Sequence, residues 1–388
     1  MFGKSYRLFK LFGFTVSIDL TWFIIGFLIA WSLASSLFPM LYPSLSTSTY
    51  WMMGVAGAIG LFLSIVFHEL CHSLIARHYG LPMGGITLFI FGGVAQMNEE
   101  PDNPKTEFLM AIAGPISSGI LGSVFLVTSI VGEITTITVA VTGLFLYLAV
   151  LNFLLAGFNL IPGFPLDGGR ILRSILWHWK NNLRWATKVS SNIGSGFGMA
   201  LILLGIFRFV QGQFIPGLWS CLIGMFIRNA ARSSFQQLLL RQTLSGEKVA
   251  HFMNDRPITV TTQTTINELV ENYIYHYHHK VYPVVEEGTV HGLVHSRSVR
   301  DIPREEWGTR TVNDILEPAS ESNTVSSQVD ALTAFSQMNN TKSSRLLVVD
   351  NGTLQGIISL KDLMTFFSFK LEVEEGTPEI PPTMRTEG

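Results

Sequence analysis

The sequence carries little charge for its length. Only 14% of its 388 residues are Asp, Glu, Lys or Arg, whereas about 25% is usual in soluble proteins. This deficit argues against a purely soluble enzyme. The formal net charge of −2 provides no polycationic face, so we expect no nucleic-acid partner.

Cysteine is also scarce. The two cysteines, Cys71 and Cys221, both lie in apolar stretches. Two thiols cannot form the dense disulfide framework of a small secreted protein. We therefore expect that disulfide bonds do not hold this chain together.

The missing charge is concentrated in three stretches. Residues 20–68 contain no charged side chain, and residues 108–166 and 189–227 contain only Glu133 and Arg208. A helix that spans a bilayer needs about 20 mostly apolar residues. Divided at their polar, Gly and Pro breaks, these stretches predict a polytopic α-helical membrane domain with six spans, near residues 17–37, 52–77, 107–131, 135–158, 192–210 and 213–231.

Basic residues predict how these spans are oriented. Lys and Arg precede the first span, follow the second, lie between the fourth and fifth, and follow the sixth, all on one side of a six-span arrangement. The opposite loops, 38–51, 132–134 and 211–213, contain neither. The positive-inside rule therefore predicts a multi-pass protein in the membrane lipid with both termini in the cytoplasm.

After about residue 235 the composition becomes that of a soluble α/β domain. The segment 284–294, VVEEGTVHGLV, reappears as VVDNGTLQGII at residues 348–358. Such a duplication indicates two tandem units of strand, turn, strand and helix. We therefore predict a membrane domain over residues 1–235, a linker over 236–246, a repeated cytoplasmic domain and a disordered acidic tail over 371–388.

The second predicted span ends in an H-E-x-x-H motif formed by His68, Glu69 and His72. Residues four apart share one face of a helix, so both imidazoles can reach one metal ion while Glu69 polarises a bound water. The alternative interpretation is a helix end whose polar side chains meet water at the interface. Ionisable groups inside a membrane helix are costly and usually functional, which favours the metal site.

A catalytic zinc ion has three protein ligands and one open position, so a third ligand is needed. The candidate is Asp167, which follows Pro162 and Pro165 after the fourth span. Irregular backbone at membrane depth is tolerated where it is buried in protein or lines a water-filled cavity. In the alternative interpretation, Asp167 is the N-cap of a helix over residues 168–179.

The two motifs together resemble the site-2 protease family of intramembrane zinc metalloproteases. H-E-x-x-H in one span is followed by N-x-x-P-x-x-x-x-D-G, which begins at Asn159, near a later one. The resemblance implies that His68, His72 and Asp167 hold one Zn²⁺ ion. It further implies that Glu69 is the general base, that Asn159 lies near the reacting peptide, and that the substrates are transmembrane proteins.

Two positions depart from the family pattern. Cys71 stands where the family often has Gly, and we expect its thiol to face away from the metal. The element Gly114-Pro115-Ile116-Ser117-Ser118 resembles a family Gly-Pro element that often ends in Asn. We therefore do not expect a catalytic role for Ser118.

Residues 85–97 have the composition of strands with a Gly-Gly break and resemble the membrane-associated hairpin of the family. A substrate helix must unwind before it is cleaved, and an extended peptide can recover its hydrogen bonds at a sheet edge. We predict that an edge strand containing Gly85, Ile86 and Leu88 receives the substrate. In the alternative interpretation, the hairpin only packs the helices together.

The duplicated cytoplasmic unit resembles a CBS-domain pair, over residues 247–302 and 310–370, and the branch of the family that it resembles is prokaryotic. Such pairs often hold an adenine nucleotide through a Ser or Thr followed by an Asp. Ser359 and Asp362 match this pattern, whereas the first repeat has Ser298 in place of the Asp. In the alternative interpretation, the pair forms a homodimer and binds no nucleotide.

Two functions therefore compete at this point. The first is an intramembrane zinc endopeptidase that performs regulated intramembrane proteolysis and is modulated by its CBS pair. The second is a membrane cation transporter that is gated by the CBS pair and uses the same His, Glu and Asp cluster. A transporter would need paired repeats in the membrane half, and no such halves are evident in the sequence.

Overall fold

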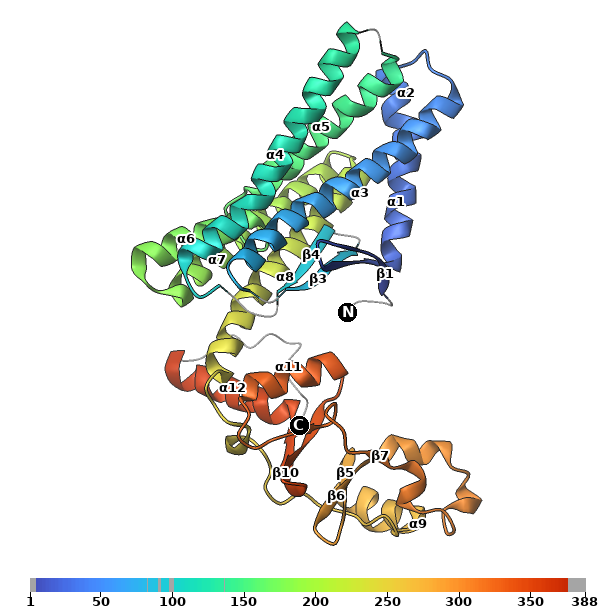
Figure 1. The fold of residues 1–388 in the computed structure, drawn as a ribbon, viewed down its shortest axis with the longest axis vertical. Helices are drawn as coiled ribbons and strands as arrows, with labels where there is room; N and C mark the ends of the chain where they lie inside the picture. The colour runs from blue at the N-terminus through green and yellow to red at the C-terminus, as the bar shows by residue number, and fades with distance from the viewer. Residues whose placement is uncertain (1–4, 82, 90–91, 98–100, 136, 376–388) are drawn as a thin grey trace. The chain divides into compact units, whose positions relative to one another are not determined.

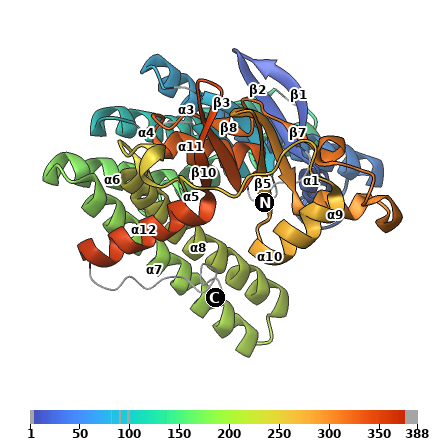
Figure 2. The same ribbon diagram turned by 90° about the horizontal axis from the view of Figure 1, so that it is seen from below.

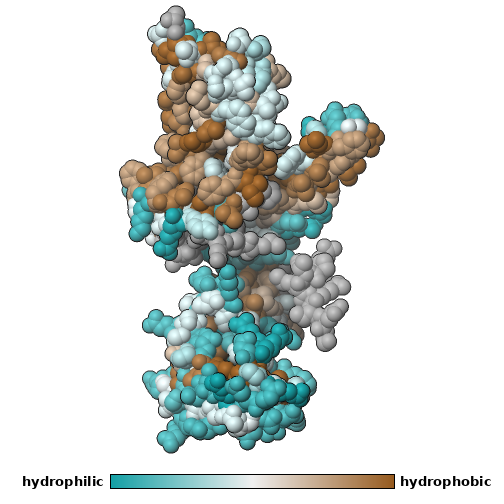
Figure 3. All heavy atoms as spheres, turned by 90° about the vertical axis from the view of Figure 1, so that its right-hand side faces the viewer, coloured by the Kyte–Doolittle hydropathy of each residue, from teal (hydrophilic) through white to brown (hydrophobic). Residues whose placement is uncertain are grey.

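The computed structural model describes residues 5–81, 83–89, 92–97, 101–135 and 137–375. The chain divides into two compact units, Met1–Gln236 and Gln237–Gly388. Figure 1 shows that the first unit is built mainly of long helices and the second of short helices and small sheets. On the face seen in Figure 3, apolar residues make up much of the surface of the helical unit, and polar residues make up most of the surface of the other.

The described part of the first unit has six helical segments long and apolar enough to cross a membrane, as predicted. The first segment combines α1 (Leu20–Ser32), a π-helical turn and α2 (Phe38–Leu41). The other five helices overlap the predicted spans but differ from them at their ends. They are α3 (Thr47–His78), α4 (Pro104–Ile134), α5 (Val139–Asn159), α7 (Leu183–Val210) and α8 (Phe214–Leu244).

Three of these helices begin at a polar cap. The side chains of Ser46, Asn103 and Asn182 accept hydrogen bonds from the backbone N–H groups at the starts of α3, α4 and α7. Each cap satisfies a donor that has no partner inside the helix. The caps fix where the long apolar segments begin.

Small residues set the close packing of the last two long helices. Figures 1 and 2 show α7 and α8 running side by side. A Cβ atom added to Gly198 in α7 would lie 2.7 Å from the carbonyl oxygen of Gly224 in α8. Close approach through small residues is a common way to pack helices in membranes.

A shorter helix, α6 (Asp167–Lys180), lies between α5 and α7 in the chain. It packs against α4 and α7. A Cβ atom on Gly168 would lie 2.3 Å from the carbonyl oxygen of Ile161. Glycine at this position therefore lets the preceding Pro-rich loop fold back onto the start of α6.

The first unit also contains a four-stranded sheet, in the order β1-β2-β3-β4. Sequence reasoning did not predict its first two strands. The strands are β1 (Ser5–Leu11), β2 (Phe14–Asp19), β3 (Met83–Phe89) and β4 (Gly92–Met97).

The prediction of an edge strand at Gly85, Ile86 and Leu88 is wrong. These residues belong to β3, which pairs in parallel with β2 on one side and antiparallel with β4 on the other. Ile86 lies opposite Val16 of β2 and opposite Ala95 of β4. Because both sides of β3 are already paired, the edges of the described sheet are β1 and β4.

The second unit contains the predicted duplication. The segments 284–294 and 348–358 form antiparallel hairpins, β5–β6 and β9–β10. Each hairpin turns through a residue pair with positive φ, Glu287-Gly288 and Asn351-Gly352, as a type I′ turn requires. The strands are β5 (Val281–Glu286), β6 (Thr289–His295), β7 (Glu317–Pro318), β8 (Thr324–Val325), β9 (Arg345–Asp350) and β10 (Thr353–Ser359).

Short helices complete each repeat, and the two repeats share a core. Val281 and Leu293 of the first repeat pack in one cluster with Leu347 of the second. The principal helices of the second repeat are α11 (Ala331–Thr341) and α12 (Leu360–Glu375). The first repeat has α9 (Ile266–Glu268), a π-helical turn (Leu269–Ile274) and α10 (Tyr275–Tyr277).

Two predicted boundaries differ from the structure. Most of the expected linker, residues 236–244, forms the last turns of α8. The first residues of the expected disordered tail, 371–375, are the end of α12, and the remainder of the tail lies outside the described residues. Helical propensity therefore extends both elements beyond the points where the composition changes.

Candidate metal centre

The H-E-x-x-H motif lies in the C-terminal half of α3. His68 and His72 are one turn apart and face the interior, with exposed fractions of 3% and 9%. Their Nε2 atoms are 3.1 Å apart. The helix therefore places both imidazoles at one buried point, as the spacing predicted.

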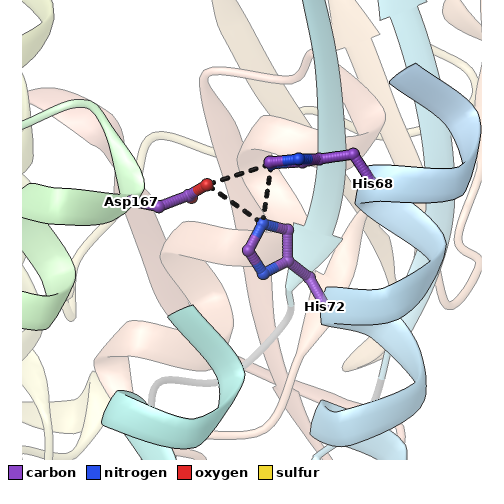
Figure 4. A group of neighbouring side chains, drawn as sticks. All are labelled: His68, His72 and Asp167. Carbon is purple, nitrogen blue, oxygen red and sulfur yellow. Dashed lines mark hydrogen bonds and ion pairs between the residues drawn. The ribbon is translucent and has the colours of Figure 1, made fainter. Parts of the chain in front are cut away.

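Asp167, the first residue of α6, completes this group. Its Oδ2 atom lies 3.0 Å from Nε2 of His68 and 3.2 Å from Nε2 of His72. Figure 4 shows the carboxylate of Asp167 pointing toward both imidazoles. The N-cap of α6 is Leu166, and no side chain caps the helix. The alternative that Asp167 is the N-cap is therefore wrong, because its carboxylate is directed at the imidazoles.

We refer to His68, His72 and Asp167 as the metal cluster, and its geometry suits zinc. The three ligand atoms form a triangle with sides of 3.0, 3.1 and 3.2 Å. Ligands in a tetrahedron with Zn–N and Zn–O bonds of about 2.0–2.2 Å are roughly 3.3–3.6 Å apart. Two imidazole nitrogens and one carboxylate oxygen also match the number and kind of protein ligands at catalytic zinc sites.

Helix α4 orients both imidazoles. The carbonyl oxygen of Met110 accepts a hydrogen bond of 2.7 Å from Nδ1 of His72. The Oγ atom of Ser118 lies 2.8 Å from Nδ1 of His68. With the Nδ1 protons directed at α4, both Nε2 lone pairs are free for a metal. Ser118 therefore contacts a proposed metal ligand, which sequence reasoning did not predict.

Gly114 of α4 provides the space for the cluster. A Cβ atom at this position would lie 2.2 Å from Nε2 of His72 and 2.5 Å from Nε2 of His68. Met110, Gly114 and Ser118 are four residues apart and share one face of α4. The spacing alone predicts a shared helical face, and only the packing of α4 on α3 shows that this face meets the imidazoles.

The other residues singled out in the sequence lie around this centre or apart from it. Glu69 is close enough to His68, His72 and Asp167 to interact with them electrostatically. Cys71 is a free cysteine and does not belong to the cluster. Asn159 ends α5, where its Nδ2 atom donates a hydrogen bond of 3.0 Å to the carbonyl oxygen of Leu155.

The second unit contains a cavity of about 710 Å³, which we call the basic pocket. Tyr275 and Trp307 contribute aromatic surface to its wall, and Glu317 contributes one carboxylate. Its cationic lining comes from both repeats and consists of Lys280, Arg297, Arg300, Lys342 and Arg345. A cavity lined in this way suits an anionic ligand that carries an aromatic or apolar group.

The predicted nucleotide residues do not line the basic pocket. Asp362 instead accepts hydrogen bonds from the hydroxyl of Ser359, at 2.6 Å, and from its backbone N–H, at 2.9 Å. These bonds form a local cap at the start of α12. Nucleotide binding by Ser359 and Asp362 stays a prediction.

Comparisons with known proteins agree with both halves of this description. A family model of peptidase family M50 matches residues 56–136 and 127–205, and CBS-domain models match 249–305 and 312–368. Zinc metalloprotease MJ0392 of Methanocaldococcus jannaschii is 32% identical over 371 residues, which cover 96% of this chain and 98% of that protein. Rip3 of Mycobacterium tuberculosis is 33% identical over 317 residues, covering 81% of this chain and 80% of the relative.

A solved structure of a site-2 protease from Methanocaldococcus jannaschii is also similar. It shares 32% sequence identity, and the alignment covers 60% of this chain and 95% of that one with a TM-score of 0.42. The identity to MJ0392 extends over almost the whole of both chains. The protein is therefore a zinc metalloprotease of the site-2 protease type, a member of peptidase family M50 with a C-terminal pair of CBS domains.

Proposed function

We propose that this protease cleaves the transmembrane segments of membrane-anchored substrates and thereby performs regulated intramembrane proteolysis. The observation that carries the proposal is the position of the metal cluster. Three ligand atoms within 3.2 Å of one another lie in a unit of six long apolar helices. Buried ionisable groups in such a unit are costly and are usually kept for function.

His68, His72 and Asp167 would hold the zinc ion. When bound, a zinc ion would lower the pKa of its water to about 7 and polarise a carbonyl group. Glu69 accepts the proton of the attacking water and passes it to the leaving amine. An amide nitrogen has two hydrogens, so the bond from Asn159 to Leu155 leaves one for a substrate carbonyl.

The substrate must present an extended peptide, and β4 supplies the edge for it. β3 is paired on both sides, whereas β4 pairs with β3 on one side and forms an edge of the described sheet. An unwound substrate segment added beside β4 recovers main-chain hydrogen bonds that it loses on leaving its helix. β4 also packs against α3, the helix of the H-E-x-x-H motif.

Cysteine cross-linking tests this edge. In a protein whose Cys71 and Cys221 are replaced by Ala, Ala95→Cys in β4 should form a disulfide with a substrate cysteine near the cleavage site. Arg7→Cys, on the opposite edge strand β1, is the matched control and should form no disulfide with the substrate. Equal cross-linking at both edges would contradict the proposal.

The CBS pair would modulate this activity from the cytoplasm by binding an adenine nucleotide, and it would also form a homodimer. The five cationic side chains of the basic pocket supply the charge that a nucleotide phosphate needs. Ser359 and Asp362 form a second candidate position. The cytoplasmic placement of both termini follows from the distribution of Lys and Arg among the loops.

Glu69→Gln tests the proposed chemistry. We expect the full-length variant in nanodiscs to bind zinc in the same ratio as the wild type but to lose cleavage of a transmembrane reporter, because Gln cannot accept the proton. His68→Ala is the companion variant and should lose both zinc binding and reporter cleavage. Reporter cleavage by Glu69→Gln at the wild-type rate would contradict the role of Glu69. No cleavage by either protein, together with cation uptake, would favour the transporter.

A further inference from the structure

A buried ion pair joins α4 to α6. Glu107, in the first turn of α4, has an exposed fraction of 0%, and Arg173 of α6 has 4%. The Nε atom of Arg173 donates a hydrogen bond of 2.5 Å to Oε1 of Glu107, and its Nη2 atom contacts the same oxygen. Neither residue is one of the three members of the metal cluster.

Holding two helices together with a buried ion pair carries a large desolvation cost. Both charges have been removed from water, and an apolar pair of similar size is often as stable as a buried ion pair. What the ion pair adds is directionality, because a guanidinium group and a carboxylate attract strongly only in a narrow range of geometries. Its presence therefore indicates a need for one relative placement of α4 and α6.

The pair joins α4, the helix that contacts both imidazoles, to α6, the helix that begins with Asp167. On α4, Glu107 precedes Met110, Gly114 and Ser118 by three, seven and eleven residues, so all four share one helical face. Those three residues contact the imidazoles of the cluster. On α6, Arg173 follows the cluster carboxylate by less than two turns.

Arg173 also holds the loop that leads to this carboxylate. Its guanidinium lies over the ring of Phe164, 5.2 Å from the centroid. Phe164 is 4% exposed, and its backbone N–H donates to the carbonyl oxygen of Ser190 in α7. One side chain therefore touches both the helix that orients the imidazoles and the loop that precedes Asp167.

We propose that Glu107 and Arg173 are positioning residues, which fix the distance between the Asp167 carboxylate and the two imidazoles. The inference rests on the zinc site proposed above. A helix rises 1.5 Å per residue, so a slip of α6 by a single residue would take Asp167 out of the 3.0–3.2 Å arrangement. The ion pair opposes that slip.

Zinc affinity of the full-length protein is the direct test. It is measured in detergent by competition with a chelator, and thermal unfolding is followed in parallel. Glu107→Gln and Arg173→Met each remove one partner, and both should weaken zinc binding by about tenfold or more, the usual effect of losing a group that orients metal ligands. Arg173→Lys keeps the charge but loses the planar guanidinium group. Its zinc affinity should lie between that of these two variants and that of the wild type.

The double variant Glu107→Leu with Arg173→Met separates positioning from stability. It replaces both charges by apolar groups, so it should regain most of the unfolding temperature that the single variants lose. Its zinc affinity should stay about tenfold or more below that of the wild type. If the single variants do not fold, the double variant carries the test.

Ser129→Ala is the matched control. Ser129 is buried at the far end of α4 and donates a hydrogen bond of 2.9 Å to the carbonyl oxygen of Thr142 in α5. Its loss should lower the unfolding temperature without changing the zinc affinity. Wild-type zinc affinity in the double variant would overturn the inference. Wild-type affinity in Asp167→Ala would instead overturn the proposed zinc site.

Discussion

The metal cluster and the basic pocket are constructed in different ways. In the cluster, three ligand atoms lie within 3.2 Å of one another, and buried groups of α4 hold both imidazoles. The pocket is a cavity of about 710 Å³ whose charges are at the ends of long Lys and Arg side chains. Such side chains lose considerable rotamer freedom when a ligand orders them.

This difference matches the functions proposed for the two sites, catalysis at the metal cluster and regulation at the basic pocket. Catalysis needs reacting groups within a fraction of an ångström, and a rigid shell supplies that accuracy. A regulatory site needs only a difference in affinity, which several mobile charges can provide. Single changes should therefore have large effects at the cluster and graded effects at the pocket.

The largest effect should follow Gly114→Ala. The added methyl group would meet both imidazoles of the cluster at about 2.2–2.5 Å. We expect zinc affinity and reporter cleavage to fall by about 100-fold or more, the upper end of the effects seen around metal ligands. Zinc titration of the purified variant measures the first effect and reporter cleavage the second.

Gly119→Ala is the control, because a Cβ atom at Gly119, in the same helix, meets nothing within 4 Å. It should bind zinc like the wild type. If the Gly114→Ala protein binds zinc and cleaves the reporter like the wild type, the metal cluster can adapt to the added methyl group. That result would contradict the rigidity that distinguishes the cluster from the basic pocket.

Ser118→Ala should have the next largest effect. The change removes the contact of 2.8 Å that orients His68 through its Nδ1 atom, and we expect a loss of about 10- to 100-fold in zinc affinity. Ser123→Ala, whose hydroxyl bonds only to the carbonyl oxygen of Gly119 in its own helix among the described contacts, serves as the control. Equal zinc affinity in all three proteins would mean that packing alone orients His68.

Smaller effects are expected at the basic pocket. Arg297→Ala and Arg345→Ala should each weaken ATP binding to the full-length protein by at most about fivefold, as expected for charges worth up to roughly 1 kcal/mol. Arg310→Ala, outside the pocket lining, is the control. Loss of all ATP binding from one substitution would contradict a graded pocket. A large loss in Asp362→Ala alone would place the nucleotide at Ser359 and Asp362 instead.

The smallest effect concerns a carboxylate of the second unit. The pKa of Asp350 lies below its usual range because Ser326 and Ser327 donate hydrogen bonds to it. A lowered folded-state pKa stabilises the fold above the unfolded-state pKa, and this contribution is lost as pH falls through the folded-state value. Ser326→Ala should raise the pKa of Asp350 toward its unfolded-state value, so the variant should be less stable than the wild type at neutral pH and should lose less stability as the pH falls.

Circular dichroism melts of the full-length protein over an acidic pH series measure this shift. Ser368→Ala, whose hydroxyl bonds to Met364 within α12, is the control. Superimposable profiles of all three proteins would show that Asp350 contributes nothing to the acid stability.

Sequence reasoning succeeded where the signal is local. Long uncharged stretches predicted the six spans, and the duplicated segment predicted both hairpins. The i,i+4 spacing of His68 and His72 placed two imidazoles together, and the Pro-rich loop indicated Asp167. In each case the pattern and the structural element occupy the same short segment.

It failed where the deciding contact comes from elsewhere in the chain. β3 is an interior strand because β2 pairs with it from a position about 70 residues earlier. Ser118 gains its role because α4 packs on α3, and the basic pocket draws its lining from both repeats. None of these partners could be read from the periodicity of a single segment.

The most direct test of the central claim is zinc X-ray absorption spectroscopy on the full-length wild-type protein in detergent. We expect one zinc ion per chain, with two imidazole ligands. All neighbouring atoms at about 2.0–2.2 Å should be nitrogen or oxygen. Asp167→Ala should lose one oxygen neighbour or the metal itself. A sulfur neighbour at about 2.3 Å, from Cys71 or Cys221, or a spectrum unchanged in Asp167→Ala, would contradict the account.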